Sequence, residues 1–303
     1  MTSRIRRNSV IVITFVLASA THAVDQEYAA RYNELRQQKA PDAQIEPLLN
    51  EWRTQKPDDP DAWINSANYY FNQRQTMIST KKPGKGDFGL TNAKTGKTAG
   101  SISFEQDPAS IKRAVELLDQ ATKKFPDRLD IWCGLAFIQQ ESSNFDGEFE
   151  TLKNMVAYAH EHSAALKWLK GENLPTTPDQ FIPDKLHSYG IYYEKKENPR
   201  DDKRFLQIAM FSAEQYPNHP YAPNDVAVYY SIQKDNTKTR EWLEKANKVD
   251  PKDTLVMTNL GYVCSKMGDN ATARKWYEAV IKADPDGEHA ARAKEALKKL
   301  KKK

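Results

Sequence analysis

Two Asp-Pro pairs near the C-terminus, Asp250-Pro251 and Asp284-Pro285, stand 34 residues apart, and each closes a segment with the apolar spacing of a helix. A sequence that repeats at a fixed period of about 20 to 50 residues builds its fold from stacked units. Stacking is needed because one such unit cannot bury its apolar face alone. The period therefore predicts an array of helix pairs.

The residues between the two pairs indicate how such a unit packs. Gly261 and Ala273 fall where two antiparallel helices would approach most closely, so larger side chains there would push the helices apart. Leu260 and Tyr277 would fill the space around this contact. Pro285 would end the second helix, because proline cannot continue one.

This stretch resembles a tetratricopeptide repeat. In that family a large apolar residue precedes a Leu-Gly pair, then an Ala, an aromatic and another small residue mark the second helix, and a Pro ends the unit. The matching positions are, in order, Met257, Leu260, Gly261, Ala273, Tyr277 and Pro285, with Val280 in place of the usual final Ala. The resemblance implies an all-α fold, a right-handed α-solenoid of stacked antiparallel helix pairs.

Weaker copies of the pattern extend the resemblance over nearly the whole chain. They carry small and aromatic residues at equivalent places, as in Trp132, Leu135 and Ala136, or Ala227, Tyr230, Leu243 and Ala246. We expect a solenoid over residues 24–303 with about six pairs: 28–59 (degenerate), 60–128, 129–183, 184–219 (degenerate), 220–253 and 254–287, then a capping helix and Lys tail at 288–303.

Several segments depart from the pattern. Pro223 stands near the start of the pair at 220–253, so its first helix is expected to begin late. A long helix is expected over 149–169, followed by a proline-containing loop at 170–184. Residues 198–202 are expected to form a longer loop than usual.

The pair at 60–128 contains an insertion of about one repeat length, residues 75–109, which is too rich in glycine for a helix. Alternating apolar residues between Thr80 and Asp107 predict a β-hairpin that turns at Gly96. An isolated hairpin is marginal in water, so its apolar face should pack on the helices. The hairpin is a contact element that reaches a partner, a lid over one end of the groove, or a neutral insertion. The expected cross-strand pairs are Phe88 with Phe104 and Leu90 with Ile102.

The N-terminus has the pattern of a secretory signal peptide, residues 1–23. Three arginines (Arg4, Arg6 and Arg7) precede an apolar run from Val10 to Ala20, and cleavage would follow Ala20 or Ala23. An uncleaved anchor is the alternative. We therefore expect an exported protein, periplasmic or secreted.

The formal charge of +4 comes from the two ends of the chain. Without the three N-terminal arginines and the five lysines at 298–303 the remaining body is about −4. A basic face over the folded part is typical of nucleic-acid binders, so nucleic acid is not an expected partner. No later segment is apolar enough for a membrane span. Cys133 and Cys264 lie in apolar helical patterns and are expected to be buried free thiols.

Patterns that carry catalysis or hold metals and cofactors are scarce. His160-Glu161 resembles the start of a helical zinc motif, but the second His would fall at Ala164. Gly96-Lys97-Thr98 lacks the other glycine and the flanking strand and helix of a phosphate loop. We therefore expect no catalytic, cofactor or metal site. An enzyme with its site in the inserted segments is the least favoured alternative.

The first helix of each pair lines the inner face of a tetratricopeptide array, and its side chains not needed for packing can contact a ligand. Amides and a few aromatic rings suit an extended peptide, because amides bond its backbone and rings grip its side chains. We therefore expect a protein or peptide partner in this groove. An alternative function is that of a glycan-associated or envelope-assembly factor that uses the hairpin. The alternative for the groove residues is that they are ordinary solvated positions of the helices. The expected groove residues are Asn65, Asn68, Asn72, Phe137, Gln140, Asn224, Val228, Asn259, Tyr262 and Lys266.

Overall fold

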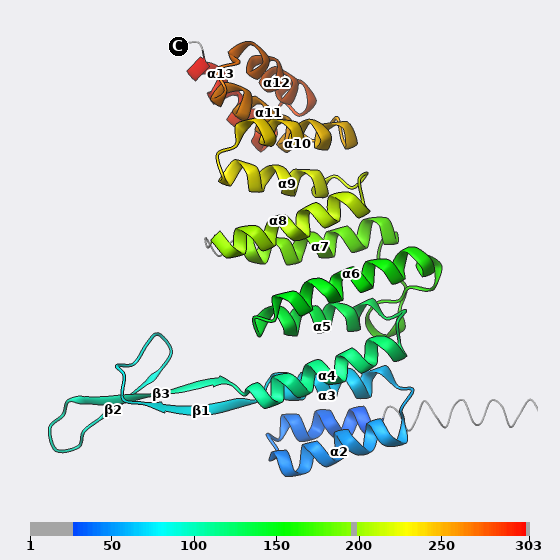
Figure 1. Cartoon of the computed structure of the whole chain (residues 1–303), viewed down its shortest axis with the longest axis vertical. Coiled ribbons are helices and arrows are strands. Elements are labelled where there is room, and N and C mark those ends of the chain that lie inside the picture. The colour runs from blue at the N-terminus through cyan, green and yellow to red at the C-terminus, as the bar shows by residue number, and fades with distance from the viewer. Residues whose placement is uncertain (1–26, 195–198, 301–303) are drawn as a thin grey trace, which may run out of the picture. The chain divides into compact units, whose positions relative to one another are not determined.

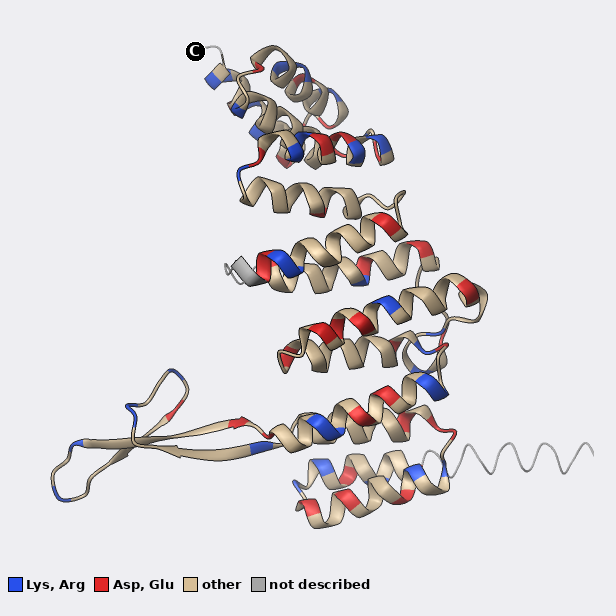
Figure 2. Cartoon of the chain, in the orientation of Figure 1, with Lys and Arg blue, Asp and Glu red and all other residues tan. Residues whose placement is uncertain are grey.

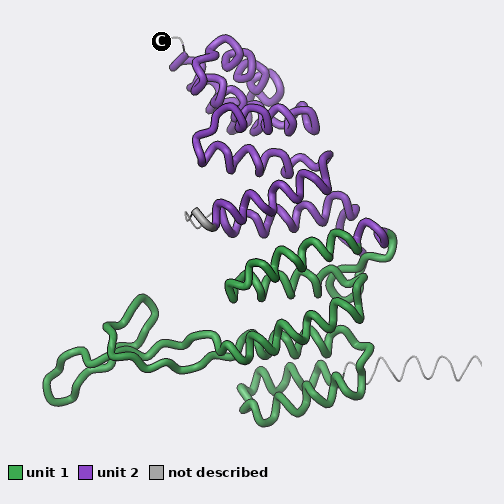
Figure 3. The backbone as a smooth tube through the Cα atoms, in the orientation of Figure 1, with its two compact units in different colours: residues 1–158, 164–172 green, residues 159–163, 173–303 purple. Residues whose placement is uncertain are grey.

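The structure is a computed structural model that describes residues 27–194 and 199–300. The expected signal peptide and the last three lysines lie outside these residues. The chain divides into two compact units (Figure 3): residues 1–158 with 164–172 form unit 1, and residues 159–163 with 173–303 form unit 2. Each unit is described by itself below.

Unit 1 consists of successive helices that pack on their neighbours, with a small β-sheet inserted between two of them (Figure 1). Residues 27–37 are helical. The helices that follow are α2 (Asp42–Gln55), α3 (Pro60–Phe71), α4 (Pro108–Lys124), α5 (Leu129–Glu141) and α6 (Phe145–His162), whose last residues belong to unit 2.

Unit 2 repeats the same arrangement of antiparallel pairs. Consecutive helices pack on each other, and α7 also contacts α9, as α11 contacts α13. Contacts of this second kind join the first helices of successive pairs. After the 3₁₀ turns η1 (Ser163–Ala165) and η2 (Leu169–Gly171), the helices are α7 (Pro178–Glu194), α8 (Pro199–Gln215), α9 (Tyr221–Ile232), α10 (Asn236–Val249), α11 (Thr254–Lys266), α12 (Asn270–Ala283) and α13 (Glu288–Leu300).

Aspartates set many of the helix starts. The side chain of Asp235 accepts a hydrogen bond from the backbone of Lys238, and that of Asp269 accepts one from Thr272. An aspartate at this place satisfies one of the N–H groups that the first turn leaves unpaired. Helices α10 and α12 accordingly begin at Asn236 and Asn270, one 34-residue period apart.

The contact between α11 and α12 depends on a missing side chain. A Cβ on Gly261 would lie only 2.6 Å from Cε1 of Tyr277, so the tyrosine ring occupies that space. Ala273, one turn before Tyr277, is fully buried in the same apolar cluster as Met257 and Val280. The two helices therefore nest as the small residues predict, and the all-α solenoid of helix pairs is confirmed.

Equivalent residues in unit 1 show the same repetition. The indole nitrogen of Trp63 donates to the carbonyl of Pro57, and that of Trp132 donates to the carbonyl of Pro126, both at 3.0 Å. Each tryptophan thus ties the first helix of a pair to the turn before it. In the first pair, Trp52 of α2 is fully buried.

The insertion contains the expected hairpin, formed by the second and third strands of a three-stranded antiparallel sheet, but the expected register was wrong and the first strand was not predicted. Its strands are β1 (Arg74–Ser79), β2 (Phe88–Thr91) and β3 (Thr98–Gln106), in the order β1-β3-β2. Phe88 pairs with Ile102, and Leu90 with Gly100, because the turn is centred one residue earlier than expected. The Asn92 side chain holds that turn by accepting from two backbone N–H groups.

The expected packing of the hairpin on the helices was also wrong. In Figure 1 the strands extend away from the ends of α3 and α4. Phe88 is 62% exposed and Phe104 is 59% exposed, so no helix covers them. A third strand supplies the additional pairing that an isolated hairpin lacks.

Four expected helix boundaries were wrong. Helix α9 begins at Tyr221 and includes Pro223, since the first turn needs no N–H at that position. Helix α7 begins at Pro178 for the same reason, which shortens the expected loop. Helix α6 ends at His162, well before residue 169. Residues 199–202 belong to the first turns of α8 rather than to a loop.

The two cysteines differ in their surroundings. Cys264 is fully buried, and burial raises the pKa of its thiol. Cys133 is only partly buried, so the expectation of burial was too strong for it. Within the described ranges, no helix combines the length and the apolar character that a bilayer crossing requires.

Candidate functional site

In unit 2 a cavity opens between α9, α10 and α11, and three of the expected groove residues line it. The cavity has a volume of about 200 Å³. Val228 comes from α9, and Asn259 and Tyr262 come from α11. The other lining residues are Ala227, Ser231, Ile232, Asn236, Thr239, Leu243 and Val263.

The lining gives the cavity an apolar floor and a polar, aromatic rim. Leu243 and Val263 are almost completely buried at its base. The Tyr262 ring is 54% exposed, although it belongs to a helix that packs on both sides. The ammonium group of Lys266 lies 5.2 Å from the centre of that ring. The site therefore offers an exposed ring and a cation beside an open apolar pocket.

Two other expected residues of unit 2 lie outside the lining of this cavity. Lys266 contacts Tyr262 but does not line the cavity. Asn224 lies outside the cavity lining, and its Oδ1 atom is buried without a hydrogen-bond partner. The α9–α11 face thus concentrates the groove residues near Tyr262.

In unit 1 the expected asparagines make local bonds. The side-chain amide of Asn65 donates to the carbonyl of Asp61 at 2.8 Å, and that of Asn72 donates to the carbonyl of Asn68 at 2.6 Å. Asn68 and Asn72 are exposed on the surface of α3 and at its end, whereas Asn65 is partly buried. These amide N–H groups are thus partly committed to the helix itself.

The remaining two residues in unit 1 divide into one exposed ring and one buried amide. Phe137 is 46% exposed and packs edge-on against Phe71, with the ring centres 5.7 Å apart. Gln140 is only 4% exposed and donates to the Glu148 carboxylate at 2.7 Å. Its place in the groove was therefore wrong, because it joins α5 to α6.

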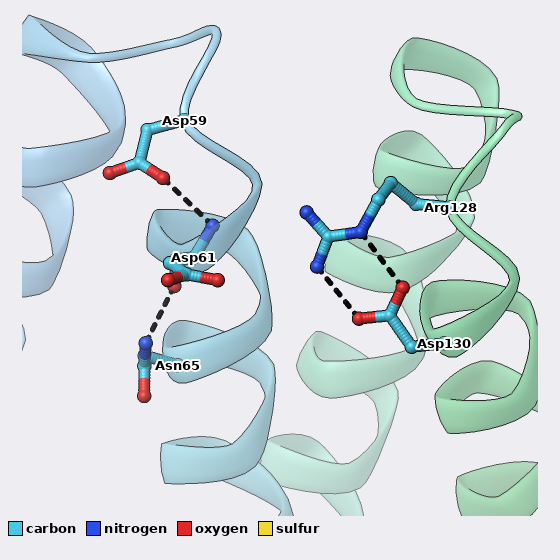
Figure 4. Close-up of polar contacts among 5 residues, drawn as sticks. All are labelled: Asp59, Asp61, Asn65, Arg128 and Asp130. Atoms are coloured by element: carbon cyan, nitrogen blue, oxygen red, sulfur yellow. Dashed lines mark hydrogen bonds and ion pairs between the residues drawn. The ribbon is translucent and has the colours of Figure 1, made fainter. Parts of the chain in front are cut away.

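A buried ion pair holds the start of α5 on the side that faces α3 (Figure 4). The Arg128 guanidinium donates to both oxygens of Asp130 at 2.9 and 2.7 Å, and both side chains are under 10% exposed. Burial by itself lowers the pKa of Arg128, but the bonds and charge of Asp130, with the charge of Asp61, raise it overall. This ion pair fixes the start of α5, and the Nε and Nη2 groups of Arg128 are occupied by Asp130 and not directed toward a ligand.

The structure also brings together a polar cluster that sequence reasoning missed. The Nδ1 atom of His187 on α7 lies 2.7 Å from a carboxylate oxygen of Asp225 on α9. The Tyr221 ring stacks on His187 with centres 4.7 Å apart and meets His219 edge-on at 5.4 Å. His187 and Asp225 are separated by 38 positions, so only the α7–α9 contact unites them.

The environments of the two histidines drive their pKa values in opposite directions. The hydrogen bond to Asp225 raises the pKa of His187, whereas burial lowers the pKa of His219. Burial raises the pKa of Asp225, and His187 partly opposes this effect. His219 and Tyr221 line a neighbouring surface hollow of about 680 Å³. No group of three or more metal-ligating side chains occurs in the part of the chain that the structure describes.

Comparison with known families identifies one repeat directly. The sequence model of the tetratricopeptide repeat matches residues 256–286, which contain most of α11 and all of α12. The search among curated proteins gave no match.

Three of the solved structures to which the chain is similar are described as tetratricopeptide-repeat proteins or domains. YrrB, described as having an unusual peptide-binding site, is 12% identical, with 82% of this chain and 97% of that chain covered and a TM-score of 0.41. The Sgt2 domain from Aspergillus fumigatus is 25% identical over 42% of this chain and 79% of its own, with a TM-score of 0.36. The first such domain of Spaghetti (RPAP3), solved with an HSP90 peptide, is 18% identical, with 40% of this chain and 90% of that chain covered and a TM-score of 0.36. The chain therefore contains a tetratricopeptide repeat at residues 256–286, within a series of stacked helix pairs.

Proposed function

We propose that this protein is a non-catalytic interaction scaffold of the cell envelope, and that it binds a segment of a partner protein on the α9–α11 face. The observation that carries the proposal is the cavity lined by Val228, Asn259 and Tyr262. Peptide binding by solved relatives such as the RPAP3 domain is consistent with this use of the fold.

The dimensions and chemistry of the cavity suit one large apolar side chain. An apolar cavity of about 150 Å³ accepts a molecule of benzene's size, so about 200 Å³ accommodates a leucine or phenylalanine side chain. Leu243 and Val263 would contact this anchor. The amides of Asn259 and Asn236 would bond the backbone of the segment, and the exposed Tyr262 ring would cover its neighbour.

Selection from a displayed library of random peptides tests this proposal. We expect the selected peptides to contain a recurrent large apolar residue. Binding should weaken by at least tenfold with Tyr262→Ala, because truncation of a central aromatic residue commonly costs about 2 kcal/mol or more. Binding is measured by fluorescence anisotropy with the selected peptide.

Leu255→Ala provides the matched control. Leu255 lies on the same helix, is 39% exposed and does not line the cavity, so its truncation should leave peptide affinity unchanged. Equal losses for the two variants, or none for Tyr262→Ala, would remove the support for the α9–α11 face. Unchanged far-ultraviolet circular dichroism would show that both variants remain folded.

The envelope location is tested separately with residues 1–30 fused to alkaline phosphatase, which is active only after export. We expect phosphatase activity and an N-terminus that begins after Ala20 or Ala23. An inactive fusion that retains Met1 would contradict export.

A further inference from the structure

One face of the inserted sheet is apolar and uncovered. Residues paired across antiparallel strands share a face, so the register places Ile78, Ile102 and Phe88 side by side. Phe104 lies on the same face, and its ring meets that of Phe88 edge-on, with the centres 6.0 Å apart. Ile78 is 73% exposed, which exceeds both phenylalanines. We call the face formed by Ile78, Phe88, Leu90, Ile102 and Phe104 the apolar sheet face.

The opposite face of the sheet is mainly polar. Its positions alternate with those above and include Gln75 paired with Glu105, and Ser79 paired with Ser101. Met77, paired with Ser103, is its one large apolar residue and is 40% exposed. The sheet is thus amphipathic although neither face packs on a helix.

Lysines lie in the loops at the far end of the sheet, where Figure 2 shows several blue segments and one red one. Residues 80–100 contain five lysines and one acidic residue, Asp87. The structure gives none of these lysine ammonium groups an ion pair with a described carboxylate. The five are Lys81, Lys82, Lys85, Lys94 and Lys97.

We propose that the sheet is a membrane-contact element, and that its occupant is the surface of a bilayer containing anionic lipids. An apolar face rich in phenylalanine can enter the boundary between headgroups and acyl chains, while lysines at its border contact anionic headgroups. Figure 1 shows the sheet clear of the α3–α4 pair, so a flat surface can reach the apolar sheet face. This inference extends beyond the proposed peptide scaffold and uses none of its residues.

Charge decides between a bilayer and a second copy of the chain. Two copies joined through the apolar sheet face would bring two sets of five lysines together, with one aspartate each. Like charges in apposition oppose association. A bilayer supplies negative charge above an apolar interior, which complements both parts of this surface.

Vesicle co-sedimentation of the full chain tests the proposal. The vesicles contain an equal mixture of phosphatidylglycerol and phosphatidylcholine, with pure phosphatidylcholine as the neutral comparison. We expect binding to the anionic vesicles that weakens as salt increases. The joint variant Phe88→Ser with Phe104→Ser should bind at least roughly tenfold more weakly, since each ring loses its apolar burial. Lys94→Gln with Lys97→Gln should weaken binding by roughly tenfold as well.

Two controls use residues elsewhere on the same chain. Met77→Ser removes an exposed apolar residue from the polar face. It is the control for Ile78→Ser, the neighbouring substitution on the apolar sheet face, which should weaken binding. Lys298→Gln with Lys299→Gln removes two charges from α13. Neither control should change vesicle affinity. All variants share the same N-terminus, so differences between them report on the substituted positions.

Several results would overturn the inference. One is equal vesicle binding by wild type and by the Phe88/Phe104 variant. Another is binding to the soluble polyanion heparin with no preference for anionic vesicles over neutral ones. A third is self-association in analytical ultracentrifugation that the same variant abolishes, in the absence of vesicle binding. Because these phenylalanines are exposed, their replacement should leave circular dichroism unchanged, and Ile78→Ser gives an independent test.

Discussion

Replacement of Gly261 by alanine tests the contact that sets the spacing of α11 and α12. An alanine Cβ would lie within 3 Å of three ring atoms of Tyr277. The ring is 4% exposed and packed in the apolar cluster, so it cannot move into solvent. Three contacts under 3 Å with a buried ring place this overpacking in the upper part of the usual range, at about 2 to 3 kcal/mol. Alanine in place of glycine in a helix gains about 1 kcal/mol, which leaves a net loss of about 1 to 2 kcal/mol.

The chain contains a matched control on α5. A Cβ added to Gly134 would meet only Cδ1 of Leu118, at an ordinary contact distance of 3.5 Å. Gly134→Ala therefore gains helix propensity without a clash and should stabilise α5 by up to about 1 kcal/mol. The two glycine replacements thus have opposite predicted signs.

Hydrogen exchange followed by mass spectrometry measures both effects locally. Gly261→Ala should speed exchange in α11 and α12 by roughly tenfold, since about 1.4 kcal/mol corresponds to a factor of ten. Gly134→Ala should slow exchange in α5. The reasoning is refuted if Gly261→Ala also slows exchange. A second refutation would come from a double-mutant cycle in which Gly261→Ala and Tyr277→Leu are additive, because a smaller residue 277 should relieve the clash.

Two further predictions concern buried charges. Arg128→Ala should lower the free energy of unfolding of unit 1 by about 3 kcal/mol, because it leaves Asp130 buried and unpaired. The double replacement Arg128→Met with Asp130→Leu should cost much less, because it leaves no buried charge. Urea denaturation measures both free energies. The pKa of His187 should lie above its ordinary 6.5. The contact between protonated His187 and Asp225 therefore stabilises the fold fully below pH 6.5, and this stabilisation is lost as pH rises through the raised pKa. In Asp225→Asn the largest influence that raises the His187 pKa is lost, while burial still lowers it against the charges of Asp184 and Glu194. NMR titration should therefore show a lower His187 pKa than in the wild type; an unchanged pKa would contradict the assignment.

The helix pairs were predictable because their signal is local and repeated. Gly261 and Tyr277 contact each other across one turn between adjacent helices, so their spacing in sequence reflects the packing directly. The same reasoning placed Val228, Asn259 and Tyr262 on one face. Their use as a binding surface stays a prediction.

Features that depend on longer-range contacts were missed. Strand β1 is recognisable only once β3 is available to pair with it, because six residues of mixed polarity carry little alternation. The register of β2 depends on a turn and on a bulge between Leu90 and Thr91. Gln140 occupies a position that usually faces the groove, but Glu148 draws it into a buried bond. The His187–Asp225 contact requires α7 to pack on α9.

The most direct measurement of the central claim is methyl NMR of the isotope-labelled chain during titration with a library-selected peptide. If the cavity between α9 and α11 seats the partner segment, the methyl signals of Val228, Ile232 and Val263 should shift with a common dissociation constant. The methyls of Ile78 and Ile102 on the sheet should stay unchanged. Shifts confined to the sheet, or an absence of shifts at the three cavity residues while peptide is bound, would contradict the claim.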